Sequence, residues 1–247
     1  MAETHARKPR LRGLDLVATT AHELKSPLVF IGGLSEMLAA EQLGRLSKSQ
    51  RDYILRINRA AARLLQLVDN LLIVNKSHYG RLSLSLEPTS VAGVLKDVLT
   101  ELGPRLLEKK ISVIWGRDVA LPPVLADAQL LYQIFFNLVD NTIKHAQGNA
   151  SVSIKFRRNA AMLIIQLDDR GFTIKPAELS RLFERFGAFN QPLSTQAAGS
   201  GLGLFIVRSL VVLMGGEITA RRLRRGTSFA ISLPIVHQLE LFDAARG

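Results

Sequence analysis

A histidine with a carboxylate beside it is the first residue pair that could do chemistry. His22 and Glu23 stand in the stretch Ala-His-Glu-Leu-Lys-Ser-Pro-Leu, residues 21–28. If Glu23 accepts one imidazole N–H, it fixes the tautomer of His22 and leaves the other nitrogen able to attack an electrophile. Pro27 cannot donate to the carbonyl of Glu23 and should bend a helix about one turn beyond the histidine. An ordinary surface histidine on the flank of a helix is the alternative.

Two carboxamides and a lysine are spaced to share one face of a later helix. Asn137, Asn141 and Lys144 follow one another at intervals of four and three residues, which is the spacing of neighbours on a helix surface. Carboxamide oxygens suit Mg²⁺, a hard cation that takes a few protein oxygens and completes its shell with water or phosphate oxygens. The lysine places a positive charge where phosphates would lie. A solvent-exposed polar face explains the same spacing.

A carboxylate lies at the end of the run of apolar residues near 161–167. Asp169 closes this run, and Gly171 follows it. A carboxylate at a strand end can accept a hydrogen bond from an exocyclic amine such as N6 of adenine, although an ordinary strand-to-loop turn has the same sequence. Further along, Phe183 and Phe186 lie at the end of a short helix, and the polar stretch 187–198 has the composition of a mobile lid.

Glycines open the helix that follows. Gly199, Gly201 and Gly203 precede an apolar helical stretch that ends at Gly215. Glycines at a helix start expose backbone N–H groups and the positive end of the helix dipole, which together form a site for phosphate. A glycine-rich turn is common, so the residues around it must decide whether phosphate binds there.

The first third of the chain is helical by its apolar period. Apolar residues alternate spacings of three and four over 14–31 and again over 54–71, which is the apolar seam of packed, nearly parallel helices. Ser47 and Gln50 form a capping box at the start of the second helix. We therefore predict a helical hairpin over about 13–77, which two chains would complete as a dimeric four-helix bundle. A plain interaction module is the alternative for heptads of this kind.

The rest of the chain alternates strands and helices. Thr89 or Ser90 is the expected N-cap of one long helix, and Asp127 is the expected N-cap of another. Strand patterns occur at 81–86, 111–115, 151–157 and 161–167, and a final hairpin runs near 217–233. This order predicts a two-layer α/β sandwich, so the whole chain is of the α+β class. The predicted division is a basic tail at 1–13, the hairpin at 14–77, a linker at 78–86, the α/β domain at 87–236 and a C-terminal tail at 237–247.

Composition excludes several classes of protein. The 247 residues are 47% hydrophobic and 21% charged, which allows a buried core and excludes a disordered chain. The absence of cysteine excludes disulfides, thiolate metal sites and cysteine nucleophiles. No apolar stretch approaches the roughly 18 residues of a membrane span, and the basic N-terminus lacks the apolar core of a signal peptide, so a cytoplasmic protein is expected.

The net charge of +11 favours anionic partners without selecting one. Nucleic acid is one such partner, because four arginines lie at the tip of the predicted final hairpin: Arg221, Arg222, Arg224 and Arg225. They are more simply a solvated edge that discourages strand pairing. We expect no nucleic-acid binding.

In order and spacing, these pieces resemble the dimerisation and ATP-binding core of the two-component sensor histidine kinases, over about residues 14–234. The stretch 22–28 is similar to the family's phospho-acceptor box. The resemblance implies that His22 is phosphorylated and that Glu23 acts as its base or orients it. Family members that also act as phosphatases use a polar residue four places after the histidine, and this position is Ser26, where threonine or asparagine is usual.

The resemblance also implies an ATP and Mg²⁺ site in a second domain of the gyrase/Hsp90/MutL-like type. Residues 137–146 are similar to the family's N box, so Asn141, with Asn137, would hold Mg²⁺ against the triphosphate and Lys144 would contact phosphate. The remaining matches are the adenine-binding turn with Asp169 and Gly171, the phenylalanine box with Phe183 and Phe186, the phosphate-side glycines Gly199, Gly201 and Gly203, and the structural pair Gly226-Thr227.

One position departs from the family's pattern, which reads Asp-x-Gly-x-Gly where this chain has threonine at the last place, Thr173. A Cβ there forbids a conformation with φ > 0 that glycine allows. If the turn tolerates threonine, the resemblance implies ATP-dependent autophosphorylation on His22 and transfer to an aspartate of a response regulator. If it does not, the chain is a catalytically weak or inactive scaffold or a phosphatase-biased partner.

The assembly that the resemblance implies is a homodimer that docks the receiver domain of a response regulator. Few residues precede the hairpin, so the stimulus is expected from an upstream sensor protein or from a segment outside this chain. The basic residues Lys8, Arg10 and Arg12 could contact anionic lipid or follow a membrane helix, which leaves membrane contact open.

Overall fold

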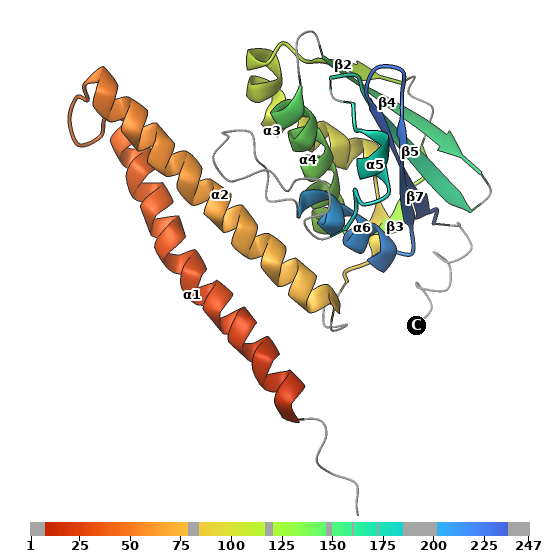
Figure 1. Cartoon of the computed structure of the whole chain (residues 1–247), viewed down its shortest axis with the longest axis horizontal. Coiled ribbons are helices and arrows are strands. Elements are labelled where there is room, and N and C mark those ends of the chain that lie inside the picture. The colour runs from red at the N-terminus through yellow and green to blue at the C-terminus, as the bar shows by residue number, and fades with distance from the viewer. Residues whose placement is uncertain are drawn as a thin grey trace, which may run out of the picture. The chain divides into compact units, whose positions relative to one another are not determined.

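The computed structural model describes residues 8–78, 84–116, 121–146, 150–159, 161–171, 173–184 and 202–236, and within the first two helices it describes only part of the side chains. The chain divides into two compact units, Met1–Leu82 and Ser83–Gly247 (Figure 1). Each unit has buried residues of its own.

The first unit is a hairpin of two helices, α1 (Lys8–Ala39) and α2 (Lys48–His78). The predicted capping box is confirmed, because the Ser47 N–H donates to Gln50 Oε1 at 2.9 Å and the Gln50 N–H donates to Ser47 Oγ at 3.3 Å. These reciprocal bonds satisfy backbone donors that the start of a helix leaves without partners. α1 begins at Lys8, inside the segment predicted as a basic tail, and it continues past Pro27 as one helix.

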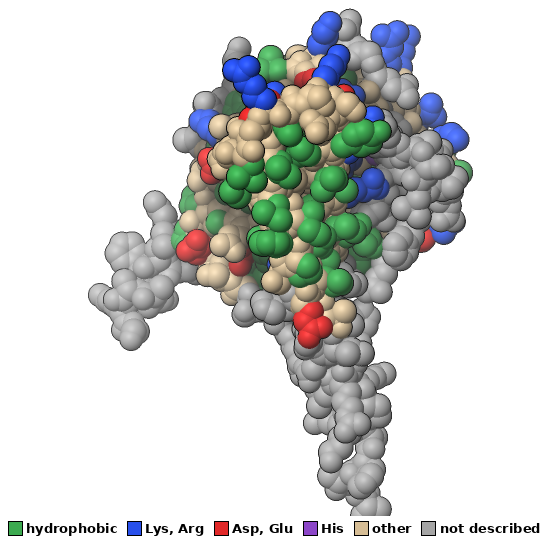
Figure 2. All heavy atoms as spheres, turned by 90° about the vertical axis from the view of Figure 1, so that its left-hand side faces the viewer, with side chains coloured by type: hydrophobic (Ala, Val, Ile, Leu, Met, Phe, Trp, Pro, Cys, Tyr) green, Lys and Arg blue, Asp and Glu red, His purple; other side chains and the backbone are tan. Residues whose placement is uncertain are grey.

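Small side chains fill the inside of this hairpin. Among its described residues, the buried ones are Ala21, Ser35, Ala61 and Val68. Large apolar side chains stay exposed on its surface: Leu24, Val29, Phe30, Ile31, Leu34, Met37, Tyr53, Leu55, Ile57 and Leu64. Figure 2 shows hydrophobic side chains gathered along one face of the helices. Part of the apolar seam is therefore uncovered in a single chain.

The second unit packs helices on one face of a five-stranded sheet (Figure 1). The strand order is β2-β4-β5-β7-β6, with β2 parallel to β4 and the other neighbours antiparallel. The strands are β2 (Ser112–Trp115), β4 (Ser151–Arg158), β5 (Met162–Asp169), β6 (Glu217–Arg222) and β7 (Thr227–Pro234). The helices are α3 (Val91–Glu108), α4 (Ala128–His145), the short α5 (Pro176–Leu179) and α6 (Gly203–Leu213). The predicted two-layer α/β sandwich is confirmed.

Local signals in the sequence set where α3 and α4 begin. Ser90 Oγ accepts from the Gly93 N–H at 3.2 Å, and Asp127 Oδ1 accepts from the N–H groups of Gln129 and Leu130 at 3.0 and 3.1 Å. Of the two residues predicted as the cap of α3, Ser90 is the N-cap and Thr89 is not, and the predicted N-cap Asp127 is confirmed. Between the helices and the sheet, the largest fully buried side chains include Leu95, Leu102, Leu131, Ile134, Phe135, Ile154, Leu163, Ile165, Ile206, Leu210 and Ile231.

One strand prediction was wrong. Of the strand predicted at 81–86, residues 84–86 have no regular structure and residues 81–83 lie outside the described residues. The next residues form β1 (Glu87–Thr89). β1 pairs antiparallel with β3 (Val124–Ala126), a strand that no sequence pattern predicts because three residues are too short to show a period.

Within the described residues, we find no helix with the length and hydrophobicity needed to cross a lipid bilayer.

Candidate functional site

The turn predicted to bind adenine begins at the last residue of β5. Asp169 is 5% exposed, and its Oδ1 accepts a hydrogen bond from the Gly171 N–H at 2.7 Å. Because side chains alternate along a strand, Asp169 shares the face of the buried Leu167, and Asp168 lies on the opposite face. A Cβ on Gly171 would lie 3.2 Å from the Cα of Ala146. The turn therefore packs against the C-terminal end of α4.

Asp168 has its own partners on the other face of the sheet. Lys155 Nζ donates to Asp168 Oδ2 at 2.8 Å, and Gln166 Nε2 donates to Oδ1 at 2.7 Å. Burial acts to raise the pKa of Asp168, but the hydrogen bonds from Gln166 and Lys155 outweigh it, so the pKa lies below its ordinary value. The two adjacent carboxylates have separate environments, and Asp169 is the one on the helical side.

Asn137 of α4 is buried, with 8% of its surface exposed. Among the described residues, no group accepts a hydrogen bond from its Nδ2. Its Oδ1 lies 3.9 Å from the position that a Cβ on Gly203 would take, so the first residue of α6 approaches it. Asn141, one turn further along α4, is half-buried. The interpretation of this face as plain solvent-exposed surface is therefore wrong for Asn137, whose buried donor is suited to a ligand.

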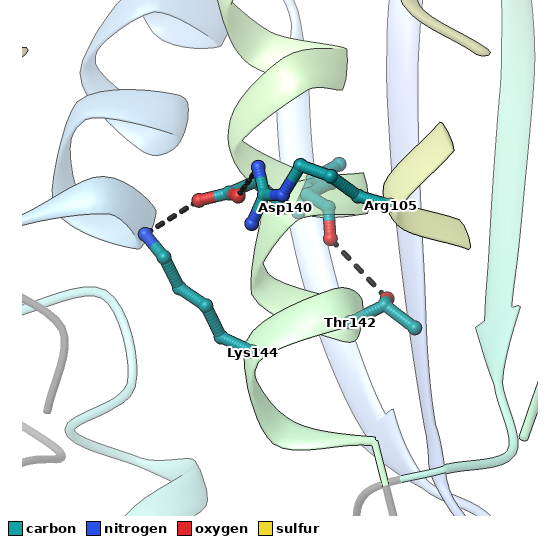
Figure 3. A network of polar contacts seen from close by, with 5 residues as sticks. Arg105, Asp140, Thr142 and Lys144 are labelled. Atoms are coloured by element: carbon teal, nitrogen blue, oxygen red, sulfur yellow. Dashed lines mark hydrogen bonds and ion pairs between the residues drawn. The ribbon is translucent and has the colours of Figure 1, made fainter. Parts of the chain in front are cut away.

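Lys144 is ion-paired within its own helix. Its Nζ lies 2.5 Å from Asp140 Oδ2, and an Nη atom of Arg105 on α3 lies 2.7 Å from Asp140 Oδ1 (Figure 3). The Asp140 side chain is 6% exposed, whereas those of Arg105 and Lys144 are 44% and 38% exposed. The buried carboxylate of Asp140 is thus ion-paired with two cationic side chains, both of which are partly exposed.

Asp140 and Arg105 are absent from the site predicted by sequence. The spacing of Asp140 and Lys144, four residues on one helix, is a signal that predicts their ion pair. Nothing in the sequence connects Arg105 with Asp140, because α3 and α4 meet only in the folded domain.

α6 begins at the last of the predicted phosphate-side glycines. Gly203 is its first residue, and Leu202 before it has no side-chain group that could cap the helix. The first N–H groups of this 11-residue helix, and with them the positive end of its dipole, therefore lie near Asn137. Phe183 is half-buried shortly after α5. Phe186, the predicted lid at 187–198, Gly199 and Gly201 lie outside the described residues.

Thr173, at the position where the family has glycine, is accommodated without a left-handed backbone. Among the described residues other than glycine, positive φ angles occur at Glu41 and Lys110. The Thr173 side chain is exposed, and its Oγ1 accepts a hydrogen bond from the Gly226 N–H at 2.8 Å. The turn therefore does not use the conformation that a Cβ would forbid.

The predicted phospho-acceptor residues lie on α1 of the first unit. His22, Glu23 and Ser26 are all helical, and Glu23 and Ser26 are exposed, while the side chain of His22 lies outside the described part of the structure. Lys25 forms an ion pair with Asp69 of α2. This pair joins the two helices close to the histidine position.

Family models match both units. A model of the His Kinase A (phospho-acceptor) domain matches residues 14–80. A model of the histidine kinase-, DNA gyrase B- and HSP90-like ATPase matches residues 126–237. Together the two models cover most of the chain.

Similar proteins match most of this chain and are longer than it. The sequence is 29% identical over 223 residues to the circadian input-output histidine kinase CikA of Synechococcus elongatus, a match that covers 89% of this chain and 30% of that protein. It is 32% identical over 226 residues to the sensor histidine kinase GacS of Pseudomonas protegens, covering 89% of this chain and 24% of that protein. The crystal structure of full-length ShkA in complex with AMPPNP aligns with a TM-score of 0.72 at 28% identity, covering 90% of this chain and 46% of that one. The chain thus spans about a quarter to a third of the two curated relatives.

Proposed function

The chain belongs to the histidine kinase family, and from this premise we propose that it phosphorylates itself on His22 with ATP and then transfers the phosphoryl group to an aspartate of a response regulator. The observation that carries the nucleotide site is Asn137, a buried carboxamide beside the first residue of α6 whose Nδ2 finds no acceptor among the residues that the structure describes. A polar ligand that bridges α4 and the start of α6 satisfies this group. The similar protein ShkA is solved with AMPPNP, and we extend nucleotide binding to this chain.

In this proposal the nucleotide lies between α4, the Asp169 turn and the start of α6. Asp169 accepts a hydrogen bond from the exocyclic amine of adenine. The first N–H groups of α6 and the ammonium group of Lys144 bind phosphate oxygens. The ion pair of Lys144 with Asp140 breaks when Lys144 pairs with a phosphate, and Asp140 stays paired with Arg105.

Asn137 and Asn141 fit the needs of Mg²⁺. Among the described residues, no three His, Asp or Glu side chains form a metal-binding group. Carboxamide oxygens complemented by phosphate and water oxygens are a shell that Mg²⁺ accepts. When bound, the ion neutralises charge that builds on the phosphates.

The proposed chemistry on α1 is an in-line phosphoryl transfer. A neutral imidazole nitrogen of His22 forms a bond to the γ-phosphorus while the bond to the β,γ-bridging oxygen breaks and ADP leaves. Glu23 accepts the proton or the hydrogen bond of the other imidazole nitrogen, which keeps the lone pair of the attacking nitrogen available. In the second step, a carboxylate of the response regulator takes the phosphoryl group, and His22 returns to its neutral form.

We propose that a second copy of the chain covers the exposed apolar face of the hairpin (Figure 2). The hairpin leaves Phe30 66% and Ile57 51% exposed while it buries small residues such as Ala21 and Ala61. Exposed apolar side chains gathered on one face mark an interaction surface. Two hairpins forming a four-helix bundle bury it, as the heptad spacing predicts.

Incubation with γ-labelled ATP and Mg²⁺ tests the proposed function. We expect an acid-labile, alkali-stable label that is lost in His22→Gln and in Asn141→Ala. His78→Gln is a matched control at the end of α2, outside the phospho-acceptor stretch, and should keep the label. Addition of a cognate receiver domain should remove the label. Absence of any label at high protein and ATP concentration would instead support the inactive scaffold.

Several finer points remain predictions. They are an upstream sensor protein, phosphatase activity through Ser26, and contact of Lys8, Arg10 and Arg12 with anionic lipid. The four arginines that motivate a nucleic-acid alternative are exposed at the end of β6 and in the turn after it. Duplex DNA binding at physiological salt would be needed to support that alternative.

A further inference from the structure

Two hydrogen bonds that run in opposite directions connect the turn after β5 with the tip of the β6–β7 hairpin. Thr173 Oγ1 accepts from the Gly226 N–H at 2.8 Å, and Thr227 Oγ1 accepts from the Ile174 N–H at 3.4 Å. Each bond joins residues that are 53 positions apart in the chain. Each loop thus contributes one hydroxyl acceptor and one backbone donor to the same contact.

The two loops also touch backbone to backbone. Asp169, the last residue of β5, pairs with Thr227, the first residue of β7. Gly226 has a φ of +109°, and a Cβ there would lie 1.8 Å from the carbonyl oxygen of Asp169 and 2.8 Å from the Cα of Arg170. Only glycine fits at this position. The tip of the β6–β7 hairpin is therefore in contact with the backbone of Asp169, the residue that we propose to bind adenine.

Thr173 supplies an acceptor that a glycine in its place would lack. Gly226 is buried, so its N–H cannot exchange this acceptor for bulk water without movement of the tip. A buried donor left without an acceptor is unfavourable, and the backbone responds by shifting to another partner or opening to solvent. Because Gly226 lies against Asp169, such a shift changes the position of the Asp169 backbone and side chain.

We propose that Thr173 is a positioning residue for adenine: its hydroxyl fastens the hairpin tip to residues 169–174 and thereby holds Asp169 in its binding orientation. This inference rests on the proposed function, because it concerns the same nucleotide site. The residue that departs from the family's glycine pattern is then a stabilising contact of the turn. Thr173 acts through Asp169 and not on the reacting atoms.

ADP binding to the full chain, measured by calorimetry with Mg²⁺, tests the proposal. Thr173→Val keeps the branched shape and removes the acceptor, whereas Thr173→Ser keeps the hydroxyl. We expect Thr173→Val to raise the Kd for ADP about three- to tenfold, the effect of one lost hydrogen bond, and Thr173→Ser to stay within about twofold. In the autophosphorylation assay, the KM for ATP should rise by the same factor, with kcat changed less than about twofold. Thr219→Val, on exposed β6 surface, is the matched control and should leave Kd unchanged.

Equal ADP affinity of the wild type and Thr173→Val overturns the inference, as does a loss in Thr173→Ser as large as that in Thr173→Val. If the wild type itself does not bind ADP, the proposed function fails, and hydrogen exchange then tests the contact alone. The Gly226 amide should exchange at least about tenfold faster in Thr173→Val than in the wild type. Unchanged exchange overturns the inference. Thr173→Ala replaces Thr173→Val in both measurements should the valine variant not fold.

Discussion

Lys144 Nζ lies 2.5 Å from Asp140 Oδ2, so the side chain that we propose to bind phosphate is held by a carboxylate one turn earlier on its own helix (Figure 3). The carboxylate is buried and Arg105 is its second partner. Asp140 therefore keeps a cation after Lys144 turns toward a nucleotide. Without that second partner, release of Lys144 would leave a buried charge unpaired, which is strongly unfavourable.

Replacement of Asp140 by asparagine should destabilise the second unit. Asp140→Asn removes both ion pairs, and we expect a loss of about 1–2 kcal/mol of unfolding free energy. The loss of unfolding free energy is small because the side chains of Arg105 and Lys144 are more than one-third exposed and remain solvated. Urea unfolding followed by the fluorescence of Trp115 reports this unit, since Trp115 is the single tryptophan of the chain and lies on β2.

Lys144→Gln is the matched comparison for Asp140→Asn. It leaves the Arg105–Asp140 pair in place and should cost less stability than Asp140→Asn. Nucleotide binding should show the reverse order, with the larger loss in Lys144→Gln. An unchanged urea midpoint in Asp140→Asn would contradict the assigned role of Asp140 as the shared partner.

The N-cap of α4 gives a second prediction. Asp127 Oδ1 caps two N–H groups of the helix, and Oδ2 accepts from the Ser85 N–H at 3.2 Å. Asp127→Ala removes all three bonds and should lower the stability of the second unit by about 1–2 kcal/mol. Asp127→Asn keeps one capping oxygen and should recover most of the loss. The Trp115 unfolding curve measures both variants, and an alanine variant as stable as the asparagine variant would contradict the capping role.

Local features of the fold were predictable from sequence because they depend on residues a few positions apart. The capping box of Ser47 and Gln50 and the caps at Ser90 and Asp127 need only neighbours in the chain. The same holds for the helical hairpin, whose apolar period is read along each helix. Pairing of β1 with β3 was not predictable, since each strand has three residues and the partners are separated by a whole helix and strand.

The sequence predicts the residue types of the candidate site, but it predicts their arrangement in space only in part. The spacing of Asn137 and Asn141 predicts a shared helix face, but the burial of Asn137 arises when α6 packs on α4. The bond from Gly226 to Thr173 joins two loops 53 residues apart, and sequence patterns carry no signal for such a contact. The sequence shows only that Thr173 stands where the family has glycine. The role that we propose for its hydroxyl depends on the contact with Gly226, which forms only in the folded domain.

Dimerisation through the hairpin gives a third prediction. Ile57 is 51% exposed on α2 and belongs to the apolar seam. Ile57→Lys places a charge in the proposed dimer interface and should shift the chain from dimer to monomer in sedimentation experiments, since burying an unpaired charge is costly. Leu43→Lys is the control, because Leu43 is 72% exposed in the turn between the helices and should tolerate the charge. A wild-type chain that sediments as a monomer at high concentration would exclude the proposed dimer.

Acid should weaken the second unit through His145, at the end of α4. Burial and the nearby charge of Lys144 lower the pKa of His145 below its ordinary value of 6.5, and the charge of Asp140 opposes this only in part. The folded chain therefore keeps the imidazole neutral where the unfolded chain already binds a proton, so stability should fall as pH decreases through about 6.5 and be fully present above it. His145→Gln cannot bind this proton, and its urea midpoint, followed by Trp115 fluorescence, should fall less than that of the wild type between about pH 7.5 and 5.5. Parallel curves for the wild type and His145→Gln would show that another group is responsible for the acid sensitivity.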